Sequence, residues 1–342
     1  MDPRVTVERL VDPAASDTLI DDARRGLFSS PKALPPKHLY DAEGGRLFEE
    51  ICTLPEYYPT RTETALLREI APELVERASP TSMIELGSGS STKTRILLDA
   101  LGARGRAAQY VSIDLDESAL RAGARELAQR YPWLSIRALV ADFEAPLARL
   151  PRGETTLVAF LGGTIGNLDE PAAHALLSRL ASAVGPGASL LLGVDRVKDP
   201  RRLAAAYDDS RGVTARFNLN LLRILNRRLG ATFDPRDFRH VAFYDPGARR
   251  VEMHLAARRR LEVRLPALDR TVRFEAEETV RTEISRKFTE ETARQMVEGA
   301  GWKLWELFSP PSQDFSLVWA KADGRIRLEP EAGRLAAQSG FH

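Results

Sequence analysis

Apolar runs of strand length alternate with helical stretches between about residues 80 and 195. The runs are SMIEL (82–86), AQYVSID (108–114), SIRALVAD (135–142), TLVAFLG (156–162) and SLLLGVD (189–195). Helical periodicity separates them, near residues 93–101, 117–130 and 170–183. Continuous apolar strands with helical spacers are typical of a parallel sheet covered on both faces. The pattern therefore predicts an α/β fold whose ligand-binding edge lies at the C-terminal ends of the strands.

The pattern on either side of this sheet is different. Before it lies a helical stretch, RTETALLREIAPELVERA, which Thr60 could cap. After Asp195 comes a long helical segment around residues 200–229, and then the alternating runs FRHVAFY, RVEMHLAARR and RTVRFEA, which are typical of antiparallel strands. The last apolar runs, KLWELFS and DFSLVWAKA, can close the first sheet as an antiparallel hairpin.

These changes of pattern predict two domains. Residues 61–199 and 286–322 would form a discontinuous ligand-binding domain, and an inserted α+β domain would hold the substrate. The first 60 residues contain amphipathic helical stretches but no clear strand, so we assign 1–60 to the substrate-binding domain together with 200–285. Residues 323–342 form a polar C-terminal tail.

Composition excludes several kinds of protein. Lysine and arginine (49) nearly balance aspartate and glutamate (48), so the net charge of +1 gives no field that would hold nucleic acid. No apolar stretch is long enough to cross a membrane. Cys52 is the only cysteine, which excludes an internal disulfide and fits a reducing, cytoplasmic compartment. The five histidines show no spacing typical of metal ligands, and we expect no metal.

A glycine-rich turn follows the first predicted strand directly. In ELGSGSS, Gly87 and Gly89 allow a ligand to approach bare backbone. Asp114 ends the second strand, where a carboxylate can accept hydrogen bonds from a ribose diol. Asp142 and Phe143 end the third strand, where they can bind an adenine amino group and stack on the base. Three consecutive strand ends of this kind indicate an adenosyl ligand on a Rossmann-like sheet.

Longer segments resemble one family of class I methyltransferases. They are LYDAEGGRLFEEICTLPEYYPTRTE (39–63), ELGSGSSTKTRILLDAL (85–101), YVSIDLDESAL (110–120), LGGTIGNLD (161–169) and RTEISRKF (281–288). Over nearly the whole chain, the sequence resembles the histidine-specific methyltransferases of the ergothioneine pathway. That resemblance implies three S-adenosylmethionine-dependent methylations of the α-amino group of free L-histidine, which give hercynine.

The resemblance also implies roles for individual residues. The methyl donor would be bound by Tyr40, Gly87, Lys93, Asp114, Asp142 and Phe143. The histidine would be bound by Asn167 and Tyr207 at its carboxylate, Tyr57 near its amino group, Glu283 and Ser285 at its imidazole, and Phe217 and Met253 as apolar walls. Tyr40 and Tyr57 are the candidate catalytic residues, because either could relay the proton that leaves the amine.

Structural explanations exist for each residue taken alone. The tyrosines of YYPTR could pack a turn, Asn167 could cap the following helix, and Glu283 could pair with Arg281 or Lys287 on a solvated strand. Other functions also remain open at this stage: methylation of a different small amine, methylation of protein or nucleic acid, or adenosyl binding without catalysis. A site with one donor and one acceptor per chain is compatible with a monomer.

Overall fold

The computed structural model describes residues 2–10, 18–88, 92–105, 108–141 and 150–324. Its main element is an eight-stranded sheet in the order β1-β5-β4-β3-β6-β7-β14-β13. The strands are β1 (Val5–Arg9), β3 (Ser82–Leu86), β4 (Ala108–Asp114), β5 (Leu134–Val140), β6 (Thr156–Phe160), β7 (Ser189–Asp195), β13 (Trp302–Phe308) and β14 (Phe315–Ala322). The first six strands in this order are parallel to one another, whereas β14 and β13 form an antiparallel hairpin at the edge. The predicted α/β sheet and its closing hairpin are confirmed.

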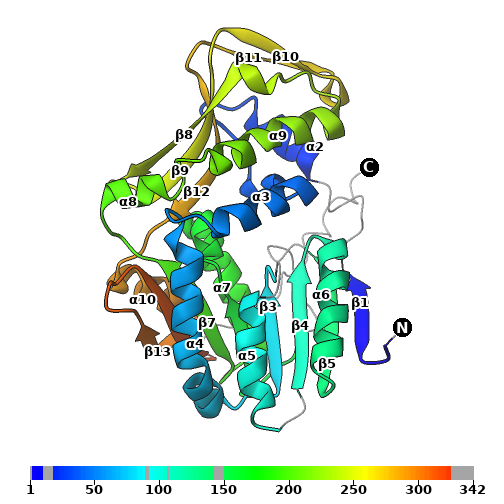
Figure 1. Cartoon of the computed structure of the whole chain (residues 1–342), viewed down its shortest axis with the longest axis vertical. Helices are drawn as coiled ribbons and strands as arrows, with labels where there is room; N and C mark the ends of the chain where they lie inside the picture. The colour runs from blue at the N-terminus through cyan, green and yellow to red at the C-terminus, as the bar shows by residue number, and fades with distance from the viewer. Residues whose placement is uncertain (1, 11–17, 89–91, 106–107, 142–149, 325–342) are drawn as a thin grey trace, which may run out of the picture.

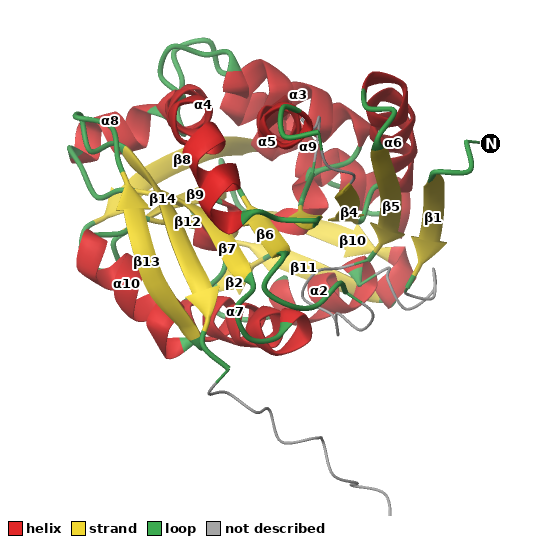
Figure 2. Ribbon diagram, turned by 90° about the horizontal axis from the view of Figure 1, so that it is seen from below, coloured by secondary structure: helices red, strands yellow, loops and turns green. Residues whose placement is uncertain are grey.

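Helices cover both faces of this sheet (Figure 1). One face carries α4 (Tyr58–Ala78), α5 (Thr92–Gly102) and α6 (Glu117–Arg130), and the other carries α7 (Glu170–Val184) and α10 (Glu290–Gly299). Figure 2 shows the two layers on opposite sides of the strands. Asp116 and Asp169 accept backbone N–H groups in the first turns of α6 and α7, so each of these helices begins at a side-chain cap.

A second layer of elements lies beyond the C-terminal ends of the parallel strands (Figure 1). Its four-stranded sheet has the order β2-β12-β9-β8, and a separate hairpin pairs β10 with β11. The strands are β2 (Lys32–Ala33), β8 (Phe238–Asp245), β9 (Arg250–Ala257), β10 (Leu261–Leu265), β11 (Arg270–Phe274) and β12 (Thr279–Arg286). The helices are α2 (Leu19–Gly26), α3 (Ala42–Cys52), α8 (Pro200–Ala205) and α9 (Val213–Leu229), and the 3₁₀ turns of the chain are η1 (Pro36–Leu39), η2 (Thr164–Asn167), η3 (Pro235–Asp237) and η4 (Pro266–Leu268).

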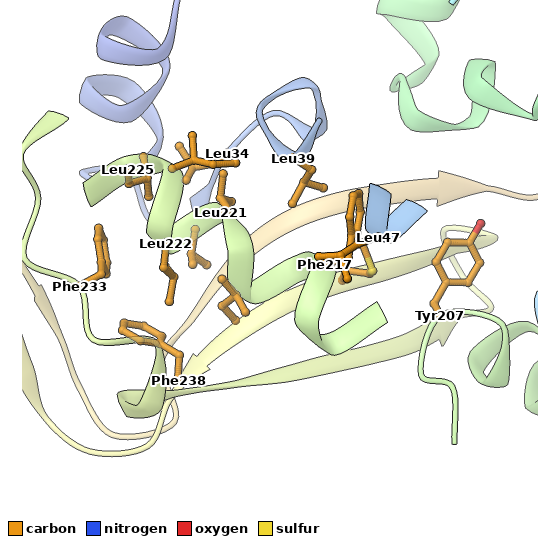
Figure 3. Close-up of a cluster of buried hydrophobic side chains, with 14 of the residues drawn as sticks. Leu34, Leu39, Leu47, Tyr207, Phe217, Leu221, Leu222, Leu225, Phe233 and Phe238 are labelled. Carbon is orange, nitrogen blue, oxygen red and sulfur yellow. The ribbon is translucent and has the colours of Figure 1, made fainter. Parts of the chain in front are cut away.

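The second layer has its own apolar core. Leucines of α9, such as Leu221 and Leu225, share one buried cluster with Leu39 of η1 and Leu47 of α3 (Figure 3). These side chains come from segments that are far apart along the chain, and burying them joins the N-terminal helices to the inserted strands. Tyr207 lies at one end of this cluster with its hydroxyl directed away from the leucines (Figure 3).

The N-terminus differs from the prediction. β1 pairs in parallel with β5 at the edge of the large sheet, with Val5 opposite Ile136. The assignment of all of residues 1–60 to the substrate-binding domain is therefore wrong for this strand. The segment VTVER is short and only partly apolar, as an edge strand with one solvated side tends to be, so its pattern gives little signal. For the rest of the chain, the division into two domains remains a prediction.

Two helix boundaries also differ from the prediction. Thr60 does not cap α4, which begins at Tyr58 with Pro59 in its first turn, and the Thr60 hydroxyl donates instead to Cys52 Sγ at 3.2 Å. The long helical segment after residue 200 is broken between α8 and α9. There, Gly212 adopts a φ of 65°, and the Asp209 carboxylate accepts backbone N–H groups at the start of α9.

Candidate active site

The C-terminal ends of the parallel strands form one side of the candidate site. Gly87 follows β3 with a φ of 68°, and a side-chain carbon built there would meet no atom of the described residues within 4 Å, so this side of the turn can admit a ligand. Asp114 ends the neighbouring strand β4, and one of its carboxylate oxygens accepts the backbone N–H of Asp116 at 3.1 Å. The structure therefore places the turn and this aspartate on adjacent strands at the same edge. Gly89, Asp142 and Phe143 lie outside the described residues.

Lys93 is held by a carboxylate that the sequence analysis did not single out. Its Nζ lies 2.6 Å from Glu63 Oε2, and Glu63 itself has no exposed surface. Both oxygens of Glu63 also accept the backbone N–H of Gly162, at 2.8 and 2.9 Å. Glu63 thus ties α4, α5 and the turn after β6 together. The only sequence signal for this role is that Glu63 closes the segment LPEYYPTRTE.

A second buried glutamate lies under the glycine turn. Glu85, in β3, accepts hydrogen bonds from the hydroxyls of Thr94 and Tyr110. Burial raises its pKa to about 7, although those hydrogen bonds act in the opposite direction. Glu85 therefore connects β3, the strand that precedes the turn, with Thr94 of α5 and Tyr110 of β4.

Aromatic side chains form a wall that faces this edge. The ring of Tyr40 makes edge contacts with Phe48 and Phe217, with centroids 5.5 and 5.4 Å apart. Phe48 contacts Tyr57, and Tyr57 contacts Tyr207, in both cases with centroids 6.1 Å apart. The structure thus brings together four predicted site residues, and it adds Phe48, which sequence reasoning missed.

The tyrosines of this wall differ in exposure. Tyr40 is 43% exposed, whereas Tyr57 and Tyr207 are 8% and 7% exposed. Burial is the main factor that raises the pKa of Tyr57 well above its usual value, and nearby Tyr207, Cys52, Tyr40 and Glu283 add to this effect. A raised pKa keeps the phenol protonated, so Tyr57 is suited to donate or relay a proton rather than to act as a phenolate base.

Glu283 is buried on β12 opposite Met253 of β9. Burial raises its pKa to about 7, while a hydrogen bond from Asn167 and the charge of Lys287 act in the opposite direction. Asn167 lies in η2 and donates from Nδ2 to the Ile284 carbonyl at 2.9 Å. The structure therefore brings Asn167, Met253 and Glu283 together, although they come from three separate elements.

A buried polar cluster extends from Ser285 to the large sheet. The Tyr207 hydroxyl donates to Ser285 Oγ at 2.7 Å, and Lys287 Nζ donates to both of these oxygens. Lys287 also lies 2.7 Å from Asp195 Oδ2, at the end of β7. Asp195 accepts further hydrogen bonds from Tyr58 and Lys198. Lys287, Asp195, Tyr58 and Lys198 were not predicted as site residues.

These contacts contradict two of the structural explanations. Asn167 does not cap the following helix, because Asp169 does so. Glu283 does not pair with Lys287 or Arg281 on a solvated strand: Glu283 is buried, Lys287 pairs with Asp195, and Arg281 lies 3.9 Å from Glu252. The tyrosines of YYPTR are buried, and Tyr58 hydrogen-bonds Asp195 as well as packing.

Among the described residues, no group of three or more histidine, cysteine, aspartate or glutamate side chains could hold a metal ion. Four of the histidines lie in this part of the chain, and each has a hydrogen-bond partner. His38 bonds Asp22, His174 bonds the Gly299 carbonyl, His240 bonds the Tyr207 carbonyl, and His254 bonds Glu252. Within the described ranges, no helix combines the length and the apolar character needed to span a bilayer.

Comparison with known proteins identifies the family. Residues 19–322 match the family of S-adenosylmethionine-dependent, histidine-specific methyltransferases. The chain belongs to this family. It is 44% identical over 311 residues to the histidine N-alpha-methyltransferase of Mycolicibacterium smegmatis, covering 91% of this chain and 97% of that protein. It is 30% identical over 295 residues to ergothioneine biosynthesis protein 1 of Schizosaccharomyces pombe, covering 83% of this chain and 38% of that protein.

Among solved structures, the chain is similar to the 1,6-didemethyltoxoflavin-N1-methyltransferase of Burkholderia thailandensis. The TM-score is 0.44 at 14% identity, over 86% of this chain and 93% of that one. The predicted family and the predicted class of enzyme, an S-adenosylmethionine-dependent N-methyltransferase, are confirmed by the family match and the relatives.

The residues present fit a sulfonium donor with an adenosyl group. The turn at Gly87 leaves its backbone open, and Asp114 places a carboxylate at the next strand end. Lys93 is a cation whose side chain is 22% exposed, so it can meet a carboxylate while it keeps Glu63 as a partner. When bound, S-adenosylmethionine supplies a methyl group on a positively charged sulfur. The protein's task is to present a neutral nucleophile behind that methyl group.

Proposed function

We propose that this enzyme methylates the α-amino nitrogen of free L-histidine three times and so forms hercynine for ergothioneine synthesis. The observation that carries the proposal is the placement of Glu283 and Ser285 side by side on one face of β12, beside Met253 and the aromatic wall. A carboxylate can accept a hydrogen bond from an imidazole N–H, and a hydroxyl can donate one to the other ring nitrogen. The family match and the relative named as a histidine N-alpha-methyltransferase support the same substrate.

The proposed contacts would orient the amino acid in the site. Asn167 and Tyr207 would hold its carboxylate, Tyr57 would lie at its amino group, and Phe217 would form an apolar wall. An amide and phenols can donate hydrogen bonds to a carboxylate without adding charge near the electrophilic methyl group. Residues at the two ends of the substrate therefore fix the position of the nitrogen between them.

Each proposed transfer forms a nitrogen–carbon bond and breaks a sulfur–carbon bond. The histidine amine loses one proton per cycle, so three cycles release three protons and leave a quaternary ammonium. The partly exposed phenol of Tyr40 and the buried phenol of Tyr57 would pass these protons toward water. Their ring faces also stabilise the positive charge that remains on the product.

The decisive experiment incubates the purified protein with S-adenosylmethionine and each of the twenty amino acids in turn, with analysis by mass spectrometry. We expect histidine to gain three methyl groups. Trimethylation of a different amino acid instead would support the alternative, a same-fold N-methyltransferase that acts on another small amine. Donor binding without methyl transfer to any amino acid would contradict both.

We further propose that the enzyme acts as a monomer in the cytoplasm and binds no nucleic acid. All of the proposed contacts come from one chain, the net charge is near zero, and a single cysteine suits a reducing compartment. Sedimentation of the protein and a mobility-shift assay with RNA and DNA test the first and last of these statements.

A further inference from the structure

The side chain of Lys287 has all of its hydrogen bonds inside the protein. Its three ammonium hydrogens match three acceptors, namely Tyr207 Oη at 2.9 Å, Ser285 Oγ at 2.8 Å and Asp195 Oδ2 at 2.7 Å. The side chain has no exposed surface. Burial acts to lower its pKa, but the charge of Asp195 and the hydrogen bonds to Asp195 and Tyr207 outweigh burial and keep the pKa above the ordinary value of lysine. Lys287 is therefore a permanent cation that cannot bind substrate itself.

This cation fixes the direction of the hydrogen bonds around it. An ammonium group only donates, so the oxygens of Tyr207 and Ser285 must accept from it. In the structure, the Tyr207 hydroxyl donates to Ser285 Oγ. When histidine binds, the proposed contact of Tyr207 with the substrate carboxylate takes that hydrogen, and Ser285 Oγ still accepts from Lys287. In both states the hydrogen of Ser285 Oγ remains to be donated. Among the described residues, no acceptor for that hydrogen is found.

Ser285 and Glu283 are two residues apart on β12, so their side chains point to the same face of the strand. One is then a donor and the other, when ionised, is an acceptor. A neutral imidazole ring presents the complementary pair, one bare nitrogen and one N–H. A protonated imidazole has no bare nitrogen, and an indole has only an N–H.

We propose that Lys287, anchored by Asp195, is a positioning residue that fixes Ser285 as a hydrogen-bond donor and so makes the site selective for a neutral imidazole. The proposal rests on the proposed function, because it takes histidine as the substrate. It also gives Lys287 a second effect, since its positive charge favours the ionised, accepting form of Glu283. The other titratable groups near Glu283 are Tyr40, Tyr57 and Tyr207, and all three are neutral phenols at neutral pH.

The test compares Lys287→Met with Lys198→Met. Lys198 donates to the same Asp195 at 2.5 Å and is partly buried, but within the described residues no contact joins it to Ser285 or Tyr207. Either variant leaves Asp195 with one lysine and with Tyr58, so both should fold. We expect Lys287→Met to raise the KM for histidine about tenfold and to leave the KM for the donor unchanged. We expect Lys198→Met to change the KM for histidine less than about twofold.

A double-mutant cycle separates positioning from a general structural effect. If Lys287 acts through Ser285, the double variant Ser285→Ala/Lys287→Met should have nearly the same KM for histidine as Lys287→Met alone. In Lys287→Met, the acid limb of kcat/KM should also move to higher pH, because Glu283 loses a neighbouring cation. Free histidine titrates identically in all of these assays, so any difference between the curves belongs to the protein.

The outcomes are distinguishable. If the wild-type enzyme does not methylate histidine, the proposed function fails and the role of Lys287 fails with it. If the wild-type enzyme methylates histidine while Lys287→Met keeps its KM, or if the two substitutions multiply their effects, the proposed function stands and the role of Lys287 is overturned. Should Lys287→Met not fold, Lys287→Gln in the same cycle gives the same decision.

Discussion

The two sides of the candidate site are built in different ways. The donor side consists of a backbone turn and partly exposed groups at the ends of neighbouring strands, such as Gly87 and Asp114. The acceptor side consists of buried groups, such as Glu283 and Tyr207, from segments distant in the sequence. A common donor needs a stable platform, whereas choosing one acceptor needs polar groups that are costly to leave unpaired. Changes on the donor side should therefore affect the fold or donor binding, and changes on the acceptor side should affect selectivity.

The largest expected effect concerns the platform. Glu63→Leu leaves the Gly162 N–H and the Lys93 ammonium without their buried acceptor, so we expect the free energy of unfolding to fall by about 3 kcal/mol. Denaturant unfolding monitored by circular dichroism measures this change. Glu306→Gln removes a partly exposed partner of Arg77 and should cost less than about 0.5 kcal/mol. Equal losses in the two variants would show that Glu63 has no special structural role.

The next effect concerns selectivity. Glu283→Ala removes the buried carboxylate proposed to accept the imidazole N–H. We expect kcat/KM for histidine to fall about 100-fold, which corresponds to the loss of a hydrogen bond to a charged group. The KM for the donor should change by less than about twofold. Asp114→Ala on the donor side should do the reverse, with a raised KM for the donor. If each variant impaired the use of histidine and the binding of the donor to the same extent, the division between the two sides would be wrong.

A smaller effect concerns the charge of the acceptor side. Glu283 has a pKa of about 7 in the folded protein and an ordinary carboxyl pKa when unfolded. The folded state therefore holds the Glu283 proton more tightly than the unfolded state does. The resulting gain in the free energy of unfolding is complete below the ordinary carboxyl pKa and is lost as the pH rises from there through 7. Glu283→Gln has no carboxyl group to titrate. Between pH 5 and pH 8, its free energy of unfolding should therefore rise by at least about 1 kcal/mol relative to that of the wild type. Parallel stability curves for the two proteins would contradict the raised pKa.

The smallest effect compares two helix caps. Asp41 caps α3 and also binds Asn220 and Arg227, whereas Asp116 caps α6 at the donor side. Each Asp→Ala change should cost about 1 kcal/mol of stability. Only Asp41→Ala should also lower kcat, because Tyr40, a proposed proton relay, directly precedes the cap. Calorimetric melting and steady-state kinetics of the two variants measure these effects.

The sequence predicts the donor side better than the acceptor side. The strands of the large sheet are continuous apolar runs, and the turn at Gly87 follows β3 within one residue, so pattern and motif lie together. β1 was missed because five residues with one solvated side carry little signal. The acceptor residues were found only through resemblance to a family, since nothing local marks Asn167 or Glu283 as neighbours.

The buried charges were missed for a physical reason. Lysine and glutamate are almost always exposed, so Lys287 and Glu63 look like surface residues in the sequence. Their burial depends on partners that the fold brings from far away. Asp195 is 92 residues before Lys287 in the chain, and Gly162 is 99 residues after Glu63. No window of sequence contains both members of either pair.

The contact between η2 and β12 has a mechanical consequence. Gly166 lies so close to β12 that an added side-chain carbon would come within 2.9 Å of the Arg286 carbonyl oxygen. Main chain therefore rests on main chain where the two sheets meet. This contact between two stiff backbones would hold the distance between the donor side and the acceptor side constant. The distance over which the methyl group is transferred would then be constant as well.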